Sequence, residues 1–204
     1  MEKYSELFIR AALHDLANIL AGVRGIVDLT DADQPLSPRD RSRLEAVLDE
    51  GTVTLERCRH LAMGTFPASL LEAGQDWRDQ LGVDLAPLGV LFRSRIELAY
   101  EGAAEADQWP GNLLRGFVHA VTRQALPSAR GGTLAIRCSA AAQEWQVRWS
   151  PSAGMPDGLA PGPEDKSRDI CARWTLACAS ALGASLSWED GVLRVRIPRV
   201  ARIT

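Results

Sequence analysis

The sequence predicts an α+β protein, in which an N-terminal antiparallel helical hairpin precedes a sandwich of helices on a β-sheet. Apolar residues recur every three or four positions over the first third of the chain, as they do on one face of a helix. Beyond residue 67, helical segments alternate with short strands of alternating polarity. We therefore expect two domains, residues 1–64 and residues 68–204.

The first expected helix runs from Ser5 to about Thr30, and its apolar stripe is formed by Ile9, Leu13, Leu16, Leu20, Val23 and Val27. We expect that stripe to be the buried face of the helix. Ser37 and Pro38 give the N-cap and first-turn signal of a second helix, which ends near Met63. Its residues near one apolar face are Leu44, Leu48, Leu55, Cys58 and Ala62.

A hairpin of two helices of about 25 residues has too little surface to bury both apolar stripes by itself. Two copies packed as a four-helix bundle with closed two-fold symmetry would bury them, which predicts a homodimer. The alternative is a monomer in which the hairpin packs on its own C-terminal half.

The second domain is expected to follow a linker at Gly64–Pro67. Its helices are expected at 70–92, with an interruption around Pro87, at 113–126, and at 168–182, the last closed by Gly183. Its strands are expected at 95–100, 133–138, 145–149, 185–188 and 192–197, the last two joined by a turn at 189–191. Helices that alternate with antiparallel strands favour a sheet covered on one face.

The composition and net charge of the chain argue against some classes of partner and site. The 204 residues are 46% hydrophobic and carry a net charge of −3, which argues against nucleic acid or an anionic membrane as the main partner. No apolar run approaches the roughly 18–20 residues that cross a bilayer. The four cysteines show no C-x-x-C spacing, and the three histidines form no H-E-x-x-H motif. We expect a soluble cytoplasmic protein with buried thiols and no metal site.

A polar trio on the first helix lies off the apolar stripe. His14 lies about 140° from the centre of the stripe, Asp15 about 100° from it, and Asn18 almost opposite it. A histidine of the core would lie within the stripe, so we expect all three side chains to be exposed. The alternative for His14 is a solvent-facing histidine with no role.

The run Leu13–Gly22, with His14, Asp15 and Asn18, resembles the phosphoacceptor motif H-[DE]-x-x-[NT] of sensor histidine kinases. The later elements resemble, in order, the ATPase domain of those kinases, a family shared with type II topoisomerases and heat-shock ATPases. The helix at 113–126, followed by a G-G-T run at 131–133, is similar to the helix that carries the family's Asn box and the strand after it.

The chain departs from that family at its nucleotide-binding motifs. Arg123 stands where the family has the magnesium-binding Asn, and a guanidinium offers only donors and a repelling charge. Ser150 stands in place of the adenine-binding Asp, whose charge-assisted bond a hydroxyl does not replace. The run 167–172 has none of the glycines that bring backbone N–H groups close to phosphate. The resemblance therefore implies a degenerate ATPase-like domain that binds no ATP.

Without those motifs, the chain resembles bacterial histidine phosphotransferases of kinase ancestry, which are dimers with a central bundle and a degenerate ATPase-like domain on each side. The resemblance implies a phosphorelay in which His14 passes phosphoryl groups between the aspartates of response-regulator receiver domains. Asp15 would fix the tautomer of the imidazole, and Asn18 would position a water or the phosphoryl oxygens. The implied partners are receiver domains and a hybrid histidine kinase. Magnesium would come with the receiver, and the chain itself would need no cofactor.

Two other functions are open at this point. One is a catalytically silent, kinase-like interaction module that modulates a histidine kinase or a response regulator. The other is an ATP-dependent kinase with divergent motifs. The small residues Ala17, Ala21 and Gly22 either let a receiver helix approach closely or serve ordinary helix packing.

Overall fold

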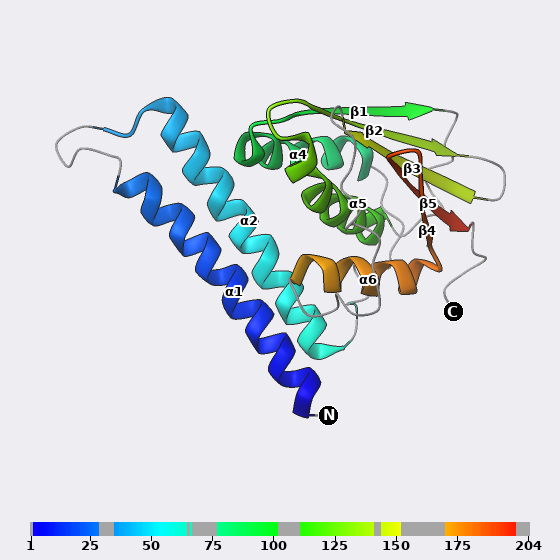
Figure 1. The fold of residues 1–204 in the computed structure, drawn as a ribbon, viewed down its shortest axis with the longest axis horizontal. Helices are drawn as coiled ribbons and strands as arrows, with labels where there is room; N and C mark the ends of the chain where they lie inside the picture. Colours follow the sequence, from blue (N-terminus) through cyan, green and yellow to red (C-terminus); the bar gives the residue numbers. More distant parts are fainter. Residues whose placement is uncertain are drawn as a thin grey trace.

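The computed structural model describes residues 2–28, 35–64, 66, 77–101, 111–140, 144–151 and 170–198. The hairpin consists of α1 (Glu2–Val27) and α2 (Pro38–Met63). The other elements, in chain order, are α4 (Trp77–Phe92), β1 (Arg95–Glu101), α5 (Gly111–Ala125), the short 3-10 helix η2 (Leu126–Ala129), β2 (Thr133–Ala140), β3 (Glu144–Pro151), α6 (Ile170–Leu182), β4 (Ser185–Glu189) and β5 (Val192–Pro198). The predicted α+β class is confirmed (Figure 1).

Local sequence signals set the ends of α2. The side chain of Ser37 accepts a hydrogen bond from the backbone N–H of Asp40, and Pro38 occupies the first turn, so the predicted N-cap is confirmed. Gly64 ends the helix with a φ of 67°, a left-handed conformation that glycine adopts without steric cost. Residues 67–76 lie outside the described part of the chain, as does most of the expected domain boundary.

The interruption predicted at Pro87 is wrong, because α4 continues through this residue to Phe92. A proline inside a helix costs one backbone hydrogen bond, and here packing offsets that cost. Leu81, Leu85 and Leu88 of α4 are all buried in the core of the protein.

The five strands form one mixed sheet in the order β1-β2-β3-β5-β4. β1 and β2 pair in parallel, with α5 in the connection between them, and the other neighbours are antiparallel. The predicted hairpin of β4 and β5 is confirmed. Its turn residues Asp190 and Gly191 have φ angles of 52° and 73°, the pair of positive values that a type I′ turn requires.

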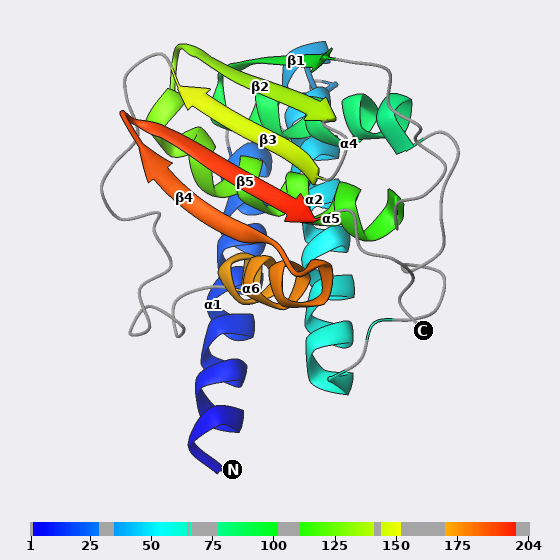
Figure 2. The ribbon, with the colours of Figure 1, turned by 90° about the vertical axis from the view of Figure 1, so that its right-hand side faces the viewer.

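The molecule is layered. Helices α4, α5 and α6 cover one face of the sheet, and α2 packs on the outside of that helix layer, with α1 beyond it (Figures 1 and 2). The main core lies between the sheet and the helices, around Phe117 of α5 and Trp149 of β3. The indole N–H of Trp149 donates to the hydroxyl of Thr122 at 2.9 Å, so this buried polar group is paired.

The face of α1 that is buried within the chain differs from the predicted stripe. Among the residues of α1 whose side chains the structure describes, Ala11, Asp15 and Ile26 are buried, because this side of the helix faces α2 and the first turn of α6. The predicted stripe lies on another side, and Ile9, Leu13, Leu20 and Val27 are all more than half exposed.

The same holds for α2. Its predicted apolar residues Leu48 and Leu55 are exposed, whereas its buried residues are Ala46, Glu50, Gly51, Thr54 and Arg57. Glu50 and Arg57 face α5, and Gly51 packs against Ile19 of α1. The hairpin therefore packs on its own C-terminal half through a partly polar face. Its apolar stripes remain open in the single chain.

Candidate functional site

His14 lies in the middle of α1 and projects into solvent, with 64% of its side chain exposed. Its Nδ1 lies 3.2 Å from Oδ1 of Asp15 and 3.3 Å from Nδ2 of Asn18, one helical turn further on. The structure thus brings the three sequence-predicted residues together. Among the described residues, no hydrogen bond or ion pair reaches the other ring nitrogen, Nε2.

This geometry favours one tautomer of His14. Nδ1 either donates a proton to the Asp15 carboxylate or accepts a bond from the Asn18 amide, but a single neutral nitrogen does not do both. A carboxylate is the stronger partner. Rotation of the Asn18 amide by 180° replaces its competing NH₂ group with an oxygen. With Nδ1 protonated, Nε2 keeps its lone pair and points to solvent as a nucleophile.

Asp15 is buried, with 3% of its surface exposed, which corrects the expectation that it shares the exposure of His14 and Asn18. Its Oδ2 accepts a hydrogen bond from the backbone N–H of Ile170, the first residue of α6, at 3.0 Å. A carboxylate at this place stabilises the helix, since the first N–H groups have no intrahelical partners and carry a partial positive charge.

The small residues near His14 differ in their surroundings. Ala17 and Ala21 are exposed. Gly22 packs against α2, because an added Cβ would lie 3.4 Å from the side chain of Val47. Gly22 therefore serves ordinary helix packing, and the two alanines leave a low, open surface beside His14.

A buried polar cluster joins α2 to α5, and sequence reasoning missed it. Glu50 forms an ion pair with Arg123 at 2.5 Å, and Arg57 contacts Nδ1 of His119 at 2.5 Å. The other carboxylate oxygen of Glu50 lies 3.7 Å from Nε2 of His119. The signal in the sequence is the spacing of Glu50, Thr54 and Arg57, which places three polar residues on one face of α2.

Burial dominates the electrostatics of this cluster. It raises the pKa of the Glu50 carboxyl, an effect that the neighbouring Arg123 and Arg57 partly oppose. Burial and the nearby guanidinium of Arg57 lower the pKa of His119 well below its usual value, so this imidazole is neutral near pH 7. A neutral His119 accepts a hydrogen bond from the Arg57 guanidinium at Nδ1.

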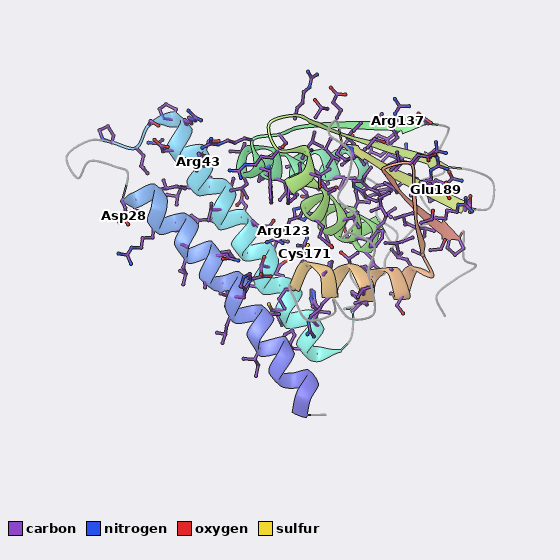
Figure 3. The ribbon with its side chains drawn as sticks, in the orientation of Figure 1. Asp28, Arg43, Arg123, Arg137, Cys171 and Glu189 are labelled. Carbon is purple, nitrogen blue, oxygen red and sulfur yellow. The ribbon has the colours of Figure 1, made fainter. Side chains whose placement is uncertain are left out.

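The structure describes two of the residues that replace the nucleotide-binding motifs, Arg123 and Ser150. Arg123 projects from α5 toward α2, where it meets Glu50 (Figure 3). Ser150 is exposed on the sheet face away from the helices. The next residue, Pro151, points to the opposite face and is buried. The only carboxylate among the described residues of β3 is Glu144, at the opposite end of the strand. Residues 167–169 lie outside the described part of the chain.

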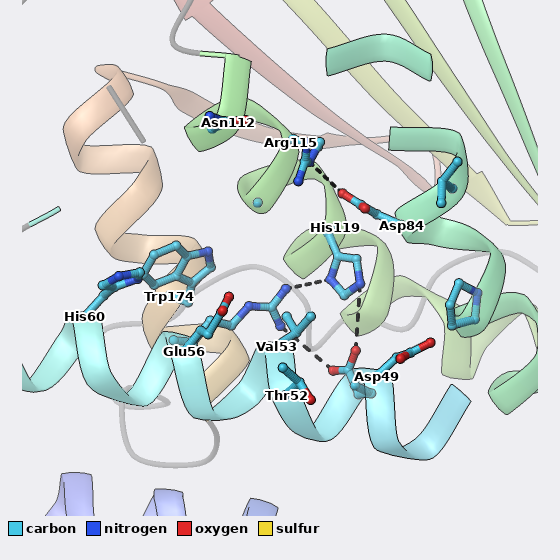
Figure 4. Close-up of a pocket in the computed structure, with 15 residues that line it drawn as sticks. Asp49, Thr52, Val53, Glu56, His60, Asp84, Asn112, Arg115, His119 and Trp174 are labelled. Carbon is cyan, nitrogen blue, oxygen red and sulfur yellow. Dashed lines mark hydrogen bonds and ion pairs between the residues drawn. The ribbon is translucent and has the colours of Figure 1, made fainter. Parts of the chain in front are cut away.

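A cleft of about 600 Å³ lies between α2 and the helices α4, α5 and α6, and Glu50, Arg57 and His119 of the polar cluster line it (Figure 4). On one side, the rings of His60 and Trp174 stack with their centroids 5.7 Å apart. On the other, Arg115 forms an ion pair with Asp84 at 2.6 Å. α1 lies on the far side of α2, so this cleft is separate from His14 (Figure 4).

Two further properties concern the described residues alone. They contain no cluster of three or more His, Cys, Asp or Glu side chains placed to hold a metal ion. None of their helices is both long enough and apolar enough to span a membrane.

Comparison with solved structures identifies the fold. The histidine kinase AdeS of Acinetobacter baumannii superposes with a TM-score of 0.54 at 13% identity, over 94% of this chain and 96% of AdeS. The fold is that of a histidine kinase. Full-length ShkA, solved in complex with AMPPNP, superposes with a TM-score of 0.51 at 11% identity, over 95% of this chain and 45% of ShkA. No protein-family model and no curated protein matches the sequence.

Proposed function

We propose that this protein is a histidine phosphotransfer protein, which relays phosphoryl groups between response-regulator aspartates through His14 and uses no ATP. One observation carries the proposal. On a histidine kinase fold, an exposed histidine directs one ring nitrogen to a buried carboxylate and leaves the other open to a partner. Two-component signalling is the setting in which that arrangement has a use.

The proposed transfer is an in-line displacement at phosphorus. Nε2 of His14 attacks the phosphoaspartate of a receiver, the N–P bond forms, and the bond between phosphorus and the aspartyl oxygen breaks. The receiver carboxylate is the leaving group. Asp15 accepts the hydrogen bond from Nδ1 and stabilises the positive charge that develops on the ring. Magnesium bound by the receiver would neutralise the phosphoryl oxygens, and the reverse step would load a second receiver.

Asn18 is proposed to position the transferred group. Its side chain is exposed, lies one turn from His14, and has an amide that can donate to a phosphoryl oxygen or to a water. The exposed Ala17 and Ala21 support close approach of a partner helix to the same surface.

The proposal that the chain uses no ATP is supported by the partners of the replaced residues. Arg123 is held by the Glu50 carboxylate and presents no oxygen to a magnesium ion. Ser150, which stands in place of the family's adenine-binding Asp, offers a hydroxyl and no carboxylate, and it lies on the sheet face away from the helices. No nucleotide cofactor is therefore included in the proposed mechanism.

The proposed functional unit is a homodimer in which two hairpins form a four-helix bundle. Its support is the open apolar stripe on each helix, with Leu13 and Leu20 on α1 and Leu48 and Leu55 on α2 all more than half exposed. Burying such side chains contributes about 1.5–3 kcal/mol for each Leu. The four cysteines are free thiols, which supports placing this unit in the reducing cytoplasm.

A second candidate is a silent, kinase-like interaction module that modulates a kinase or regulator. The hydrogen bond from Ile170 to Asp15 favours it, since this contact explains a buried Asp15 without any chemistry at His14. Phosphoryl transfer from phosphorylated receivers to the wild-type protein and to His14→Ala separates the candidates. The relay requires a label on the wild type alone.

A further inference from the structure

The sheet face opposite the helices carries a straight row of three arginines. In the strand register, Arg137 of β2 stands opposite Arg148 of β3, and Arg148 stands opposite Arg194 of β5. The residues on either side of each arginine are buried, so all three side chains project from the outer face. Figure 3 shows Arg137 pointing away from the helix layer.

The row is long enough to contact several groups of a partner. Neighbouring strands lie about 4.8 Å apart, so the three arginines span roughly 10 Å. Ala99 and Ser187 flank the two ends of the row, and Ala135, Ser139 and Ser150 occupy neighbouring outward positions on β2 and β3. The longer side chains of Gln146 on β3 and Arg196 on β5 project from the same face on one side of the row. The guanidinium groups are therefore bordered by small side chains at both ends of the row and on one of its long sides.

Folding alone does not explain this arrangement, because like charges directly opposite each other destabilise a sheet. The two outer arginines have acidic neighbours on the edge strands, with Glu101 3.9 Å from Arg137 and Glu189 2.8 Å from Arg194. The central Arg148 donates to the amide oxygen of Gln146 at 3.1 Å. Within the described residues, no carboxylate lies at ion-pairing distance from Arg148.

We propose that this arginine row (Arg137, Arg148 and Arg194) is a docking surface for an acidic segment of a partner protein. Guanidinium groups recognise carboxylates with paired, charge-assisted hydrogen bonds. A helix with carboxylates at positions i, i+4 and i+7 spans about 10 Å and matches the length of the row.

Charge also limits the occupant. Glu97, Glu101 and Glu189 lie toward the edges of the same sheet face, where each already pairs with an arginine of that face. A polyanion that extended beyond the row would have to compete with these carboxylates. The net charge of −3 acts in the same direction against nucleic acid. The row is on the far side of the sheet from the hairpin, so the inference does not depend on phosphoryl transfer at His14 (Figure 1).

The test measures binding of the full chain to a fluorescent helical peptide with glutamates at i, i+4 and i+7, by anisotropy at low salt. The same peptide with glutamines is the reference ligand. Arg148→Gln is expected to weaken binding of the glutamate peptide about tenfold, as for one lost charge-assisted contact. Arg130→Gln removes an exposed arginine outside the row and changes the net charge equally, so it should leave binding within about twofold.

Thermal unfolding separates a binding role from a structural one. Arg148→Gln relieves repulsion in the row and should keep or raise the Tm. A lowered Tm would assign the row to fold stability and overturn the proposal. Equal binding of the two peptides, equal effects of the two substitutions, or tighter binding of a DNA duplex than of the glutamate peptide would overturn it as well.

Discussion

The carboxylate of Asp15 joins His14 to helix α6 through its two oxygens. Oδ1 lies 3.2 Å from Nδ1 of His14, and Oδ2 accepts the backbone N–H of Ile170 at 3.0 Å. One buried side chain of the hairpin thus meets both the candidate phosphoacceptor and the first turn of a helix in the ATPase-like half. In the proposed transfer, a charge that developed on the imidazole would be balanced by a carboxylate that the rest of the fold holds in place.

Substitution of Asp15 tests this link. Asp15→Ala leaves the first N–H of α6 without its partner and should lower the free energy of unfolding by about 1.5–3 kcal/mol, the usual range for a hydrogen bond to a charged group. Asn18→Ala, at an exposed position one turn from His14, should change it by less than about 0.5 kcal/mol. Urea denaturation measures both, and equal losses would contradict the link.

Asp15→Asn separates chemistry from stability. The amide keeps an oxygen that can accept from Ile170, so the fold should be retained. It lacks the charge that stabilises the imidazolium, so the rate of phosphoryl transfer to His14 should fall by tenfold or more, as is typical for loss of such a group. Circular dichroism confirms the fold, and a single-turnover assay measures the rate. A variant as fast as wild type would show that the carboxylate has no role in transfer.

The open apolar stripe predicts the oligomeric state. Leu20→Glu places a charge in the proposed dimer interface and should convert the dimer to a monomer. Val83→Glu introduces the same change at an equally exposed apolar residue of α4, outside the hairpin, and should leave the dimer intact. Sedimentation velocity distinguishes the two species. A monomeric wild-type protein, or a dimer that survives Leu20→Glu, would refute the four-helix bundle.

Buried His119 predicts a pH dependence of stability. Its folded pKa is well below the usual value of 6.5, so below pH 6.5 the unfolded chain binds a proton that the folded chain does not. The free energy of unfolding should therefore fall as the pH drops below 6.5, by up to about 1.4 kcal/mol per pH unit.

His119→Gln keeps an acceptor for Arg57 and should remove this contribution. Glu50, whose pKa is raised from 4.5, acts with the opposite sign, since its stabilising effect declines as the pH rises above 4.5. The difference between wild type and His119→Gln across pH therefore reports His119 together with its coupling to Glu50, 3.7 Å away. Parallel stability curves for the two proteins would show that His119 is not a buried neutral group.

The replacement of the nucleotide-binding motifs predicts that ATP does not stabilise the protein. A ligand that binds only the folded state raises the free energy of unfolding by about 2.7 kcal/mol at a concentration 100 times its Kd, and the Tm rises with it. Addition of magnesium and ATP should leave the Tm of this protein unchanged, since Arg123 is committed to Glu50. A Tm that rises with ATP concentration would favour the reading of an ATP-dependent kinase.

Local signals in the sequence predicted the elements well, because they act over a few residues. Ser37 and Pro38 fixed the start of α2, and Asp190 with Gly191 fixed the turn of the last hairpin. The parallel pairing of β1 with β2 was beyond such signals, since it depends on how α5 carries the chain across the sheet.

The sequence indicates which residues form the candidate site, but not which of them are buried. A hydrophobic period shows that a face is apolar, but not whether that face meets the same chain or another copy. The hydrophobic period therefore predicts the stripe through Leu13 and Leu20 as the buried face, while the chain itself buries Asp15. The Glu50 and His119 pairing was missed for a related reason: residues 69 positions apart in sequence meet only through the packing of α2 on α5.

The most direct test of the account is phosphoryl transfer to the full-length protein from a panel of phosphorylated receiver domains, without ATP, beside His14→Ala. The account predicts an acid-labile, alkali-stable label on the wild type that is absent from the variant. A folded, dimeric wild-type protein that takes no label from any receiver, or a variant that is labelled as well as wild type, would contradict the relay.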